Sequence, residues 1–87
     1  MKFMVISTFE PGRTLEVRKR RLELGTNLPP GLKVLGMWSD LAGGRGFTLC
    51  EGDDPKVLAQ GGMAWSDLMS MECVPVIDSE EMLKLMK

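Results

Sequence analysis

The chain of 87 residues contains no histidine and no tyrosine. Without an imidazole, a triad with a histidine base, a histidine-ligated metal and a haem with a proximal histidine are all excluded. The two cysteines, Cys50 and Cys73, are too few for a structural zinc site. Each lies in a strand-like segment, where a small buried thiol is more usual than a disulfide. We therefore predict no metal and no cofactor.

A long apolar run and an imbalance of charge are also absent. A helix that spans a membrane needs about 18–20 consecutive apolar residues, and no such run occurs. The formal net charge is only −1, so we expect no general attraction to nucleic acid or to an anionic membrane. The first residues read as a strand and not as a signal peptide. The composition predicts a single cytoplasmic domain over residues 1–87.

Apolar alternation, turn residues and helix caps predict the element order β-α-β-β-α-β-α. Pro55 directly after Asp54 is a strong helix start, and Ser79 can cap a short C-terminal helix. Strands are predicted over residues 3–9, 32–40, 45–51 and 71–77, and helices over 14–24, from 55 to about 68, and after 79. This order is typical of a ferredoxin-like α+β sandwich (βαββαβ) with a short additional helix, whose four-stranded antiparallel sheet has the order 4-1-3-2.

Two segments support this sheet order and indicate a partner. Residues 3–9 are apolar on both alternating faces, which is typical of a central strand covered on both sides. Pro75 indicates that the last strand lies at an edge of the sheet or contains a bulge, because proline cannot donate to the ladder, and the sheet order 4-1-3-2 puts this strand at an edge. Two helices can cover only one face of the sheet. We therefore predict a homodimer in which the open sheet face of one copy covers that of the other.

Several motifs resemble those of a family of short, uncharacterised proteins (a domain of unknown function) in the dimeric α+β-barrel, ferredoxin-like superfamily. The motifs are Met1-Lys2-Phe3-Met4-Val5, Phe9-Glu10-Pro11-Gly12, Gly36-x-Trp38-x-Asp40, Gly43-Gly44-Arg45-Gly46-Phe47, Asp53-Asp54-Pro55 and Trp65-Ser66-Asp67-Leu68. The resemblance implies a homodimer whose two sheets face each other. The superfamily includes cofactor-independent monooxygenases and lactone isomerases, so an enzyme here would resemble one of those.

The sequence Trp-Ser-Asp-Leu occurs twice, at residues 38–41 and 65–68, and its first copy marks the main candidate site. By strand alternation Val34, Gly36, Trp38 and Asp40 share one face, and Gly36 leaves space beside the indole. Arg45 lies across the glycine hairpin from Asp40. Trp38, Asp40 and Arg45 can therefore bind an anionic or carbonyl-bearing ligand. The alternative is a core or interface tryptophan with an ion pair at the turn.

Three further residues are weaker candidates. Trp65 falls on the apolar stripe of the second helix, so core packing is its first explanation. Asp67 lies near the end of that helix, where it can pair with Arg45, pair with a cation of the first helix, or be solvated. Glu51 ends an apolar strand row and can act as a base if it points inward, although a glutamate there more often points to water. The candidates are Trp38, Asp40, Arg45, Trp65 and Asp67 for ligand binding, and Asp40, Arg45 and Glu51 for catalysis.

Two remaining patterns are a run of basic residues in the first helix and a partial RNA-recognition signature. The run Arg18 to Arg21 circles a helix and predicts a solvated surface. Residues 45–49 resemble the start of an RNA-recognition signature, but Leu49 stands where a second aromatic is required and the acidic Glu51 follows. We predict a homodimer that binds a small organic ligand in a pocket between sheet and helices. The alternatives are a dimerisation or regulatory module without catalysis and, remotely, an RNA-binding domain.

Overall fold

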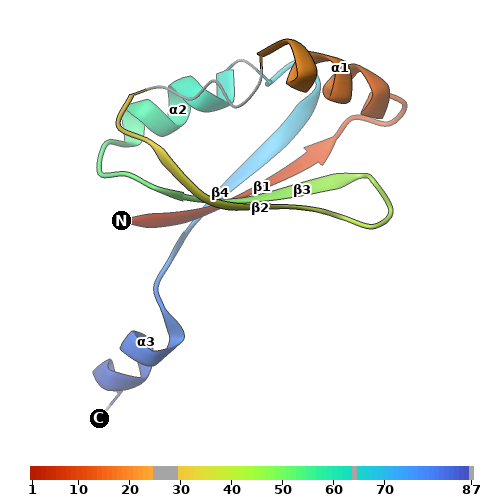
Figure 1. The fold of residues 1–87 in the computed structure, drawn as a ribbon. Coiled ribbons are helices and arrows are strands. Elements are labelled where there is room, and N and C mark those ends of the chain that lie inside the picture. Colours follow the sequence, from red (N-terminus) through yellow and green to blue (C-terminus); the bar gives the residue numbers. More distant parts are fainter. Residues whose placement is uncertain (25–29, 64, 87) are drawn as a thin grey trace.

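The computed structural model describes residues 1–24, 30–63 and 65–86, and its elements follow the predicted order (Figure 1). The strands are β1 (Lys2–Phe9), β2 (Lys33–Ser39), β3 (Arg45–Glu51) and β4 (Met69–Val76), and the helices are α1 (Thr14–Leu24), α2 (Pro55–Met63) and α3 (Ser79–Leu85). The strands form one antiparallel sheet in the order β2-β3-β1-β4. This is the predicted order read from the other edge, so the ferredoxin-like α+β fold is confirmed.

Local capping explains where two of the helices begin. Asp54 Oδ1 accepts a hydrogen bond from the backbone N–H of Lys56 at 2.9 Å, directly before α2. At α3 the capping residue is Asp78, whose Oδ1 accepts from the N–H of Glu80 at 2.8 Å, so the prediction that Ser79 caps this helix was wrong. Pro75 lies on β4 at the edge of the sheet, as predicted. Among the helices of the described residues, none is long and apolar enough to cross a membrane.

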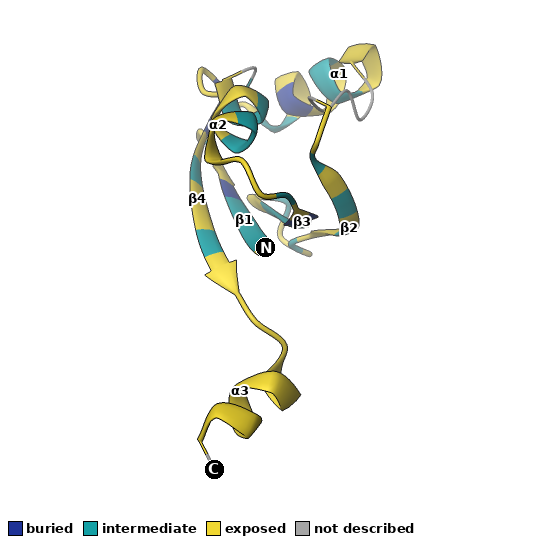
Figure 2. Ribbon diagram, turned by 90° about the vertical axis from the view of Figure 1, so that its left-hand side faces the viewer, coloured by how far each residue is buried: buried dark blue, intermediate teal, exposed yellow. Residues whose placement is uncertain are grey.

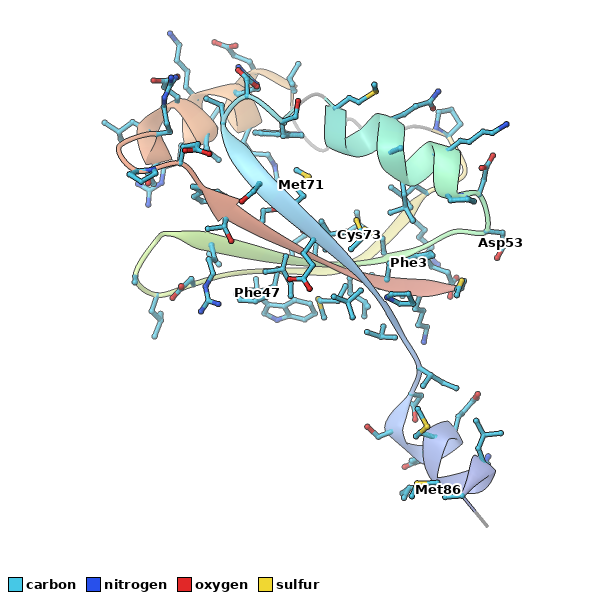
Figure 3. All side chains as sticks on the ribbon, turned by 180° about the vertical axis from the view of Figure 1, so that it is seen from behind. Phe3, Phe47, Asp53, Met71, Cys73 and Met86 are labelled. Atoms are coloured by element: carbon cyan, nitrogen blue, oxygen red, sulfur yellow. The ribbon has the colours of Figure 1, made fainter. Side chains whose placement is uncertain are left out.

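The two faces of the sheet have different surroundings. Both α1 and α2 lie over one face (Figure 1), toward which Phe9 of β1 and Met71 of β4 point to pack against Val17 of α1 and its neighbours. The alternate residues of β1 point the other way, where Ile6 pairs with Phe47. Figure 3 shows Phe47 on the side away from the helices and Met71 between sheet and helices. We call the uncovered side the open face.

A β-bulge in β2 changes which residues share a face. Val34 lies opposite Cys50, but Gly36 lies opposite Leu49, so the register shifts between the two positions. A bulge inserts one extra residue and inverts the alternation beyond it. Val34 therefore points to the helix side and Gly36 to the open face. The prediction that both lie on one face was wrong.

Few side chains are fully covered in the single chain (Figure 2). The core cluster consists of Val17, Leu68 and Met69, with Phe9, Trp65 and Met71 packed against it. The accessible surface is 6518 Å², whereas a compact monomer of 9.6 kDa exposes about 5,100 Å². The radius of gyration is 14.2 Å, against about 12 Å for a compact domain of this length. Much surface that a folded chain normally covers is therefore exposed.

The C-terminal helix accounts for part of this exposure. α3 extends from the end of β4 on the open-face side and away from the rest of the chain (Figure 1), and every described residue in it is exposed (Figure 2). Its exposed apolar side chains are Met82, Leu83 and Leu85, followed by Met86. The body of this chain thus leaves the apolar residues of α3 uncovered.

Candidate functional site

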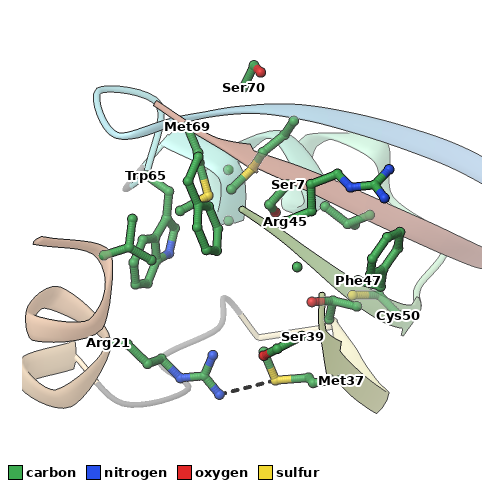
Figure 4. A pocket seen from close by; sticks show the side chains of 18 of the residues that line it. Ser7, Arg21, Met37, Ser39, Arg45, Phe47, Cys50, Trp65, Met69 and Ser70 are labelled. Atoms are coloured by element: carbon green, nitrogen blue, oxygen red, sulfur yellow. Dashed lines mark hydrogen bonds between the residues drawn. The ribbon is translucent and has the colours of Figure 1, made fainter. Parts of the chain in front are cut away.

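A hollow of about 1540 Å³ lies between the sheet and the helices α1 and α2 (Figure 4). Helices and sheet meet at the core cluster and at Gly62, where an added Cβ would lie 3.4 Å from Met71 Sδ. Away from these contacts the two layers are separated by space. The walls are mostly apolar and include Phe3, Val5, Thr48 and Cys73 from the sheet and Leu58, Ala59 and Trp65 from the helix side.

The two cysteines lie on the hollow side of the sheet but differ in exposure. Cys50 is only 3% exposed, and burial raises the pKa of its thiol, with a smaller contribution from Cys73. A buried, protonated thiol is a poor nucleophile. Cys73 is exposed, so the prediction of a buried thiol is confirmed for Cys50 and wrong for Cys73. Both thiols are free.

The arginines of α1 do not form a simple solvated surface. Val17 and Arg21 are spaced by one helical turn and share a face, and Val17 is buried against the core cluster. The side chain of Arg21 is accordingly half-buried and lines the hollow. Its Nη2 donates to Met37 Sδ of β2 at 3.1 Å (Figure 4). The prediction of a solvated run was therefore wrong for Arg21, which points toward the sheet.

Asp67 forms a bidentate ion pair with Arg20 of α1. Arg20 Nη1 donates to Asp67 Oδ1 at 2.5 Å and Nη2 donates to Oδ2 at 2.8 Å. The hydrogen bond from Arg20 lowers the pKa of Asp67, and the same bond raises the pKa of Arg20. The expected pairing with a cation of the first helix is confirmed. This pair ties the turn before β4 to α1 and occupies both carboxylate oxygens.

The two tryptophans point to opposite sides of the sheet. Trp65 is half-buried, packs against the core cluster and lines the hollow (Figure 4). Trp38 is 55% exposed and pairs with Phe47 on the open face. Its ring covers Gly36, since a Cβ added there would lie 2.6 Å from Trp38 Cη2. Trp38 also borders the hollow at the hairpin end of the sheet, but its ring lies over Gly36 on the open face, whereas the ring of Trp65 packs against the core cluster.

Asp40 and Arg45 form the pair expected from the hairpin, and they border the hollow only at that end of the sheet. Arg45 Nε lies 3.2 Å from Asp40 Oδ2, and the N–H of Ala42 donates to Asp40 Oδ1 at 3.1 Å. The bond from Ala42, followed by that from Arg45, lowers the pKa of Asp40. A carboxylate with a lowered pKa is a weak base at neutral pH. The guanidinium of Arg45 also lies 5.3 Å from the ring centroid of Phe47, a cation–π contact.

Glu51 is exposed at the end of β3, opposite Lys2 and Lys33 on the neighbouring strands. Opposite charges at such positions stabilise strand pairing, so the carboxylate of Glu51 serves the pairing of β3 with β1 and β2. Among the described residues no group of three histidine, cysteine, aspartate or glutamate side chains could hold a metal ion. The sequence analysis missed Arg21 as a residue that lines the hollow. Its position four residues after Val17, on the same face of α1, was the signal in the sequence.

The profile of a family described as a domain of unknown function (DUF3303) matches residues 1–87. No curated protein and no solved structure matches the chain significantly.

Proposed function

We propose that this chain, which belongs to the DUF3303 family, forms a homodimer and binds a small organic ligand in the hollow between sheet and helices. The hollow is the observation that carries the proposal. The space measures about 1540 Å³, is partly open to solvent and extends to the hairpin end of the sheet. Ligand sites are mostly apolar concavities of about 300–1,000 Å³ with a few polar groups, and this hollow has that chemistry with room to spare.

The open face supports the second half of the proposal. Its central residues are apolar: Met4 and Ile6 from β1, Phe47 and Leu49 from β3, and Val74 from β4. The surface of the whole chain exceeds that of a compact monomer by about 1,400 Å², and the open face, α3 and the hollow all contribute to this excess. A second copy is the proposed occupant, because a two-fold dimer brings the same apolar face of both copies together. We include α3 in this interface because it lies on the same side.

The placement of the charged residues favours binding over catalysis. The carboxylates of Asp40 and Glu51 are explained by the hairpin and by cross-strand lysines, and Arg45 contacts Asp40 and Phe47. A cofactor-independent monooxygenase or isomerase, which the superfamily resemblance suggests, would need such groups facing the ligand. Membership of the dimeric α+β-barrel superfamily and a cytoplasmic location likewise stay predictions from the sequence.

Two other functions compete with this one. In a dimerisation or regulatory module the hollow would bind no ligand, and only the open face and α3 would contact a partner. An RNA-binding domain would use Phe47 on the open face for base stacking, and the homodimer would cover that residue. A stable, folded monomer in solution would revive the RNA-binding alternative.

Because Trp65 faces the hollow and Trp38 the open face, two single-tryptophan proteins test ligand binding. Trp38→Phe leaves Trp65 as the reporter, and Trp65→Phe leaves Trp38 as the matched control. On titration with 1-octanol, a neutral amphiphile, we expect a saturable change in the emission of Trp65 and none in that of Trp38. An unchanged Trp65 emission up to the solubility limit of octanol would contradict the proposal. Native mass spectrometry of the purified protein would then identify any small molecule that co-purifies.

A further inference from the structure

The guanidinium of Arg21 extends from α1 toward the sheet, one helical turn from the core residue Val17. Val17, four residues earlier, marks this face as buried. A half-buried cation normally requires a carboxylate partner, because desolvation penalises the unpaired charge. Among the described residues the ion pairs are Met1–Asp53, Arg13–Glu16, Arg20–Asp67 and Arg45–Asp40, and none includes Arg21.

The contact that Arg21 does make is weak. Its Nη2 donates to the thioether of Met37 at 3.1 Å, and a thioether sulfur is a poor acceptor. The remaining N–H donors of the guanidinium form a planar fork that matches a carboxylate in bidentate geometry. Figure 4 shows Arg21 reaching from α1 toward β2, with Trp65 and Met69 on the apolar wall nearby. A cation beside an apolar space is the arrangement that an amphiphilic anion requires.

We infer that the ligand of the hollow is an organic carboxylate with an apolar body, held by its carboxylate at Arg21. This inference rests on the proposed ligand-binding function and adds the chemical class of the ligand. The apolar body lies against Trp65, Leu58 and Val5, and the carboxylate replaces the Met37 sulfur as the acceptor of Arg21.

The other charged groups around the hollow agree with an anion. Arg18, on the same helix, also lines the space. Of the lining carboxylates, Asp40 is held by Ala42 and Arg45, and Glu10 is exposed at the end of β1. Neither forms an ion pair with Arg21 among the described residues. The positive charge that faces the space thus remains available to a ligand.

The test compares octanoate with 1-octanol, which has the same chain length and no charge, using the emission of Trp65 in the Trp38→Phe protein. A hydrogen bond to a charged group contributes enough to make octanoate bind roughly 10- to 100-fold more tightly than octanol. Arg21→Gln should reduce the affinity for octanoate to that for octanol. Lys19→Gln removes the same charge from an exposed site on α1 that does not line the hollow, and should leave the preference intact.

The outcomes separate the two proposals. If octanol binds and octanoate binds no more tightly, or if Arg21→Gln keeps the preference, the carboxylate inference is wrong while the ligand-binding function stands. If neither compound binds, both are wrong. Far-UV circular dichroism checks the folding of each variant. If Arg21→Gln fails to fold, Arg21→Lys is the second variant, because it keeps the charge without the planar fork. Its affinity for octanoate should lie between the affinities of the Trp38→Phe protein for octanoate and for octanol. An affinity for octanoate equal to that of the Trp38→Phe protein would overturn the assignment of Arg21.

Discussion

Replacing Leu49 by aspartate tests whether the open face is covered by a second copy. Leu49 lies at the middle of this face, opposite Met4 on β1 and Gly36 on β2. In the single chain an aspartate at this position can reach water. In the proposed homodimer it is buried without a partner, which costs roughly 3 kcal/mol or more per copy.

A symmetric dimer carries the substitution twice, so the penalty is about 6 kcal/mol per dimer, or roughly a 10⁴-fold weaker association. The assay is size-exclusion chromatography with light scattering over a range of protein concentrations. Leu22→Asp is the matched control, because Leu22 is 86% exposed on α1. We expect a dimer for the parent chain and for Leu22→Asp, and a folded monomer for Leu49→Asp. A monomeric parent chain, or a Leu49→Asp protein that stays dimeric, would refute the reasoning.

Three further predictions concern the folded chain itself. Leu68 is 1% exposed in the core cluster, so Leu68→Ala should lower the free energy of unfolding by about 2–5 kcal/mol in chemical denaturation, whereas Leu22→Ala should change it by less than about 0.5 kcal/mol. Arg21→Met removes an unpaired, half-buried charge and should raise the unfolding temperature by a few degrees, roughly 4–8 °C for each kcal/mol gained. An unfolding temperature below that of the parent chain would show that other groups in the folded chain stabilise this charge. The pKa of Asp67 is lower in the folded chain than its ordinary value of 3.8, so the unfolded chain binds more protons and stability is lost as the pH falls below that value. The thermal stability of Asp67→Asn should therefore depend less on pH in this range than that of the parent chain, and equal dependence would exclude a contribution from the pair with Arg20.

Much of the fold could be predicted because several independent residues require the same arrangement. The apolar residues on both faces of β1 place it at the centre, and Pro75 places β4 at an edge. Asp54 before Pro55 marks the start of α2 by cap chemistry that acts locally. These signals depend on alternation and on local hydrogen bonds, both of which can be read from neighbouring residues.

The site was harder to predict because it depends on tertiary contacts. The bulge in β2 inverts the alternation between Val34 and Gly36. A glycine inside a strand can mark a bulge or a close approach, so Gly36 alone did not decide between the two. α1 has no clear amphipathic pattern, so only its packing through Val17 decides that Arg21 points inward. Core packing, the first explanation of Trp65, is confirmed because this residue packs against the core cluster, whereas Trp38 pairs with Phe47 on the open face.

The most direct measurement of the central claim is an intermolecular nuclear Overhauser experiment between octanoate and the isotopically labelled chain. The proposed function predicts contacts from the octanoate methylenes to the indole of Trp65 and to Leu58, both of which line the hollow. It predicts none to the indole of Trp38 on the open face. Contacts to Trp38 in place of Trp65, or no contacts to any residue of the hollow, would contradict the claim that this space is the binding site.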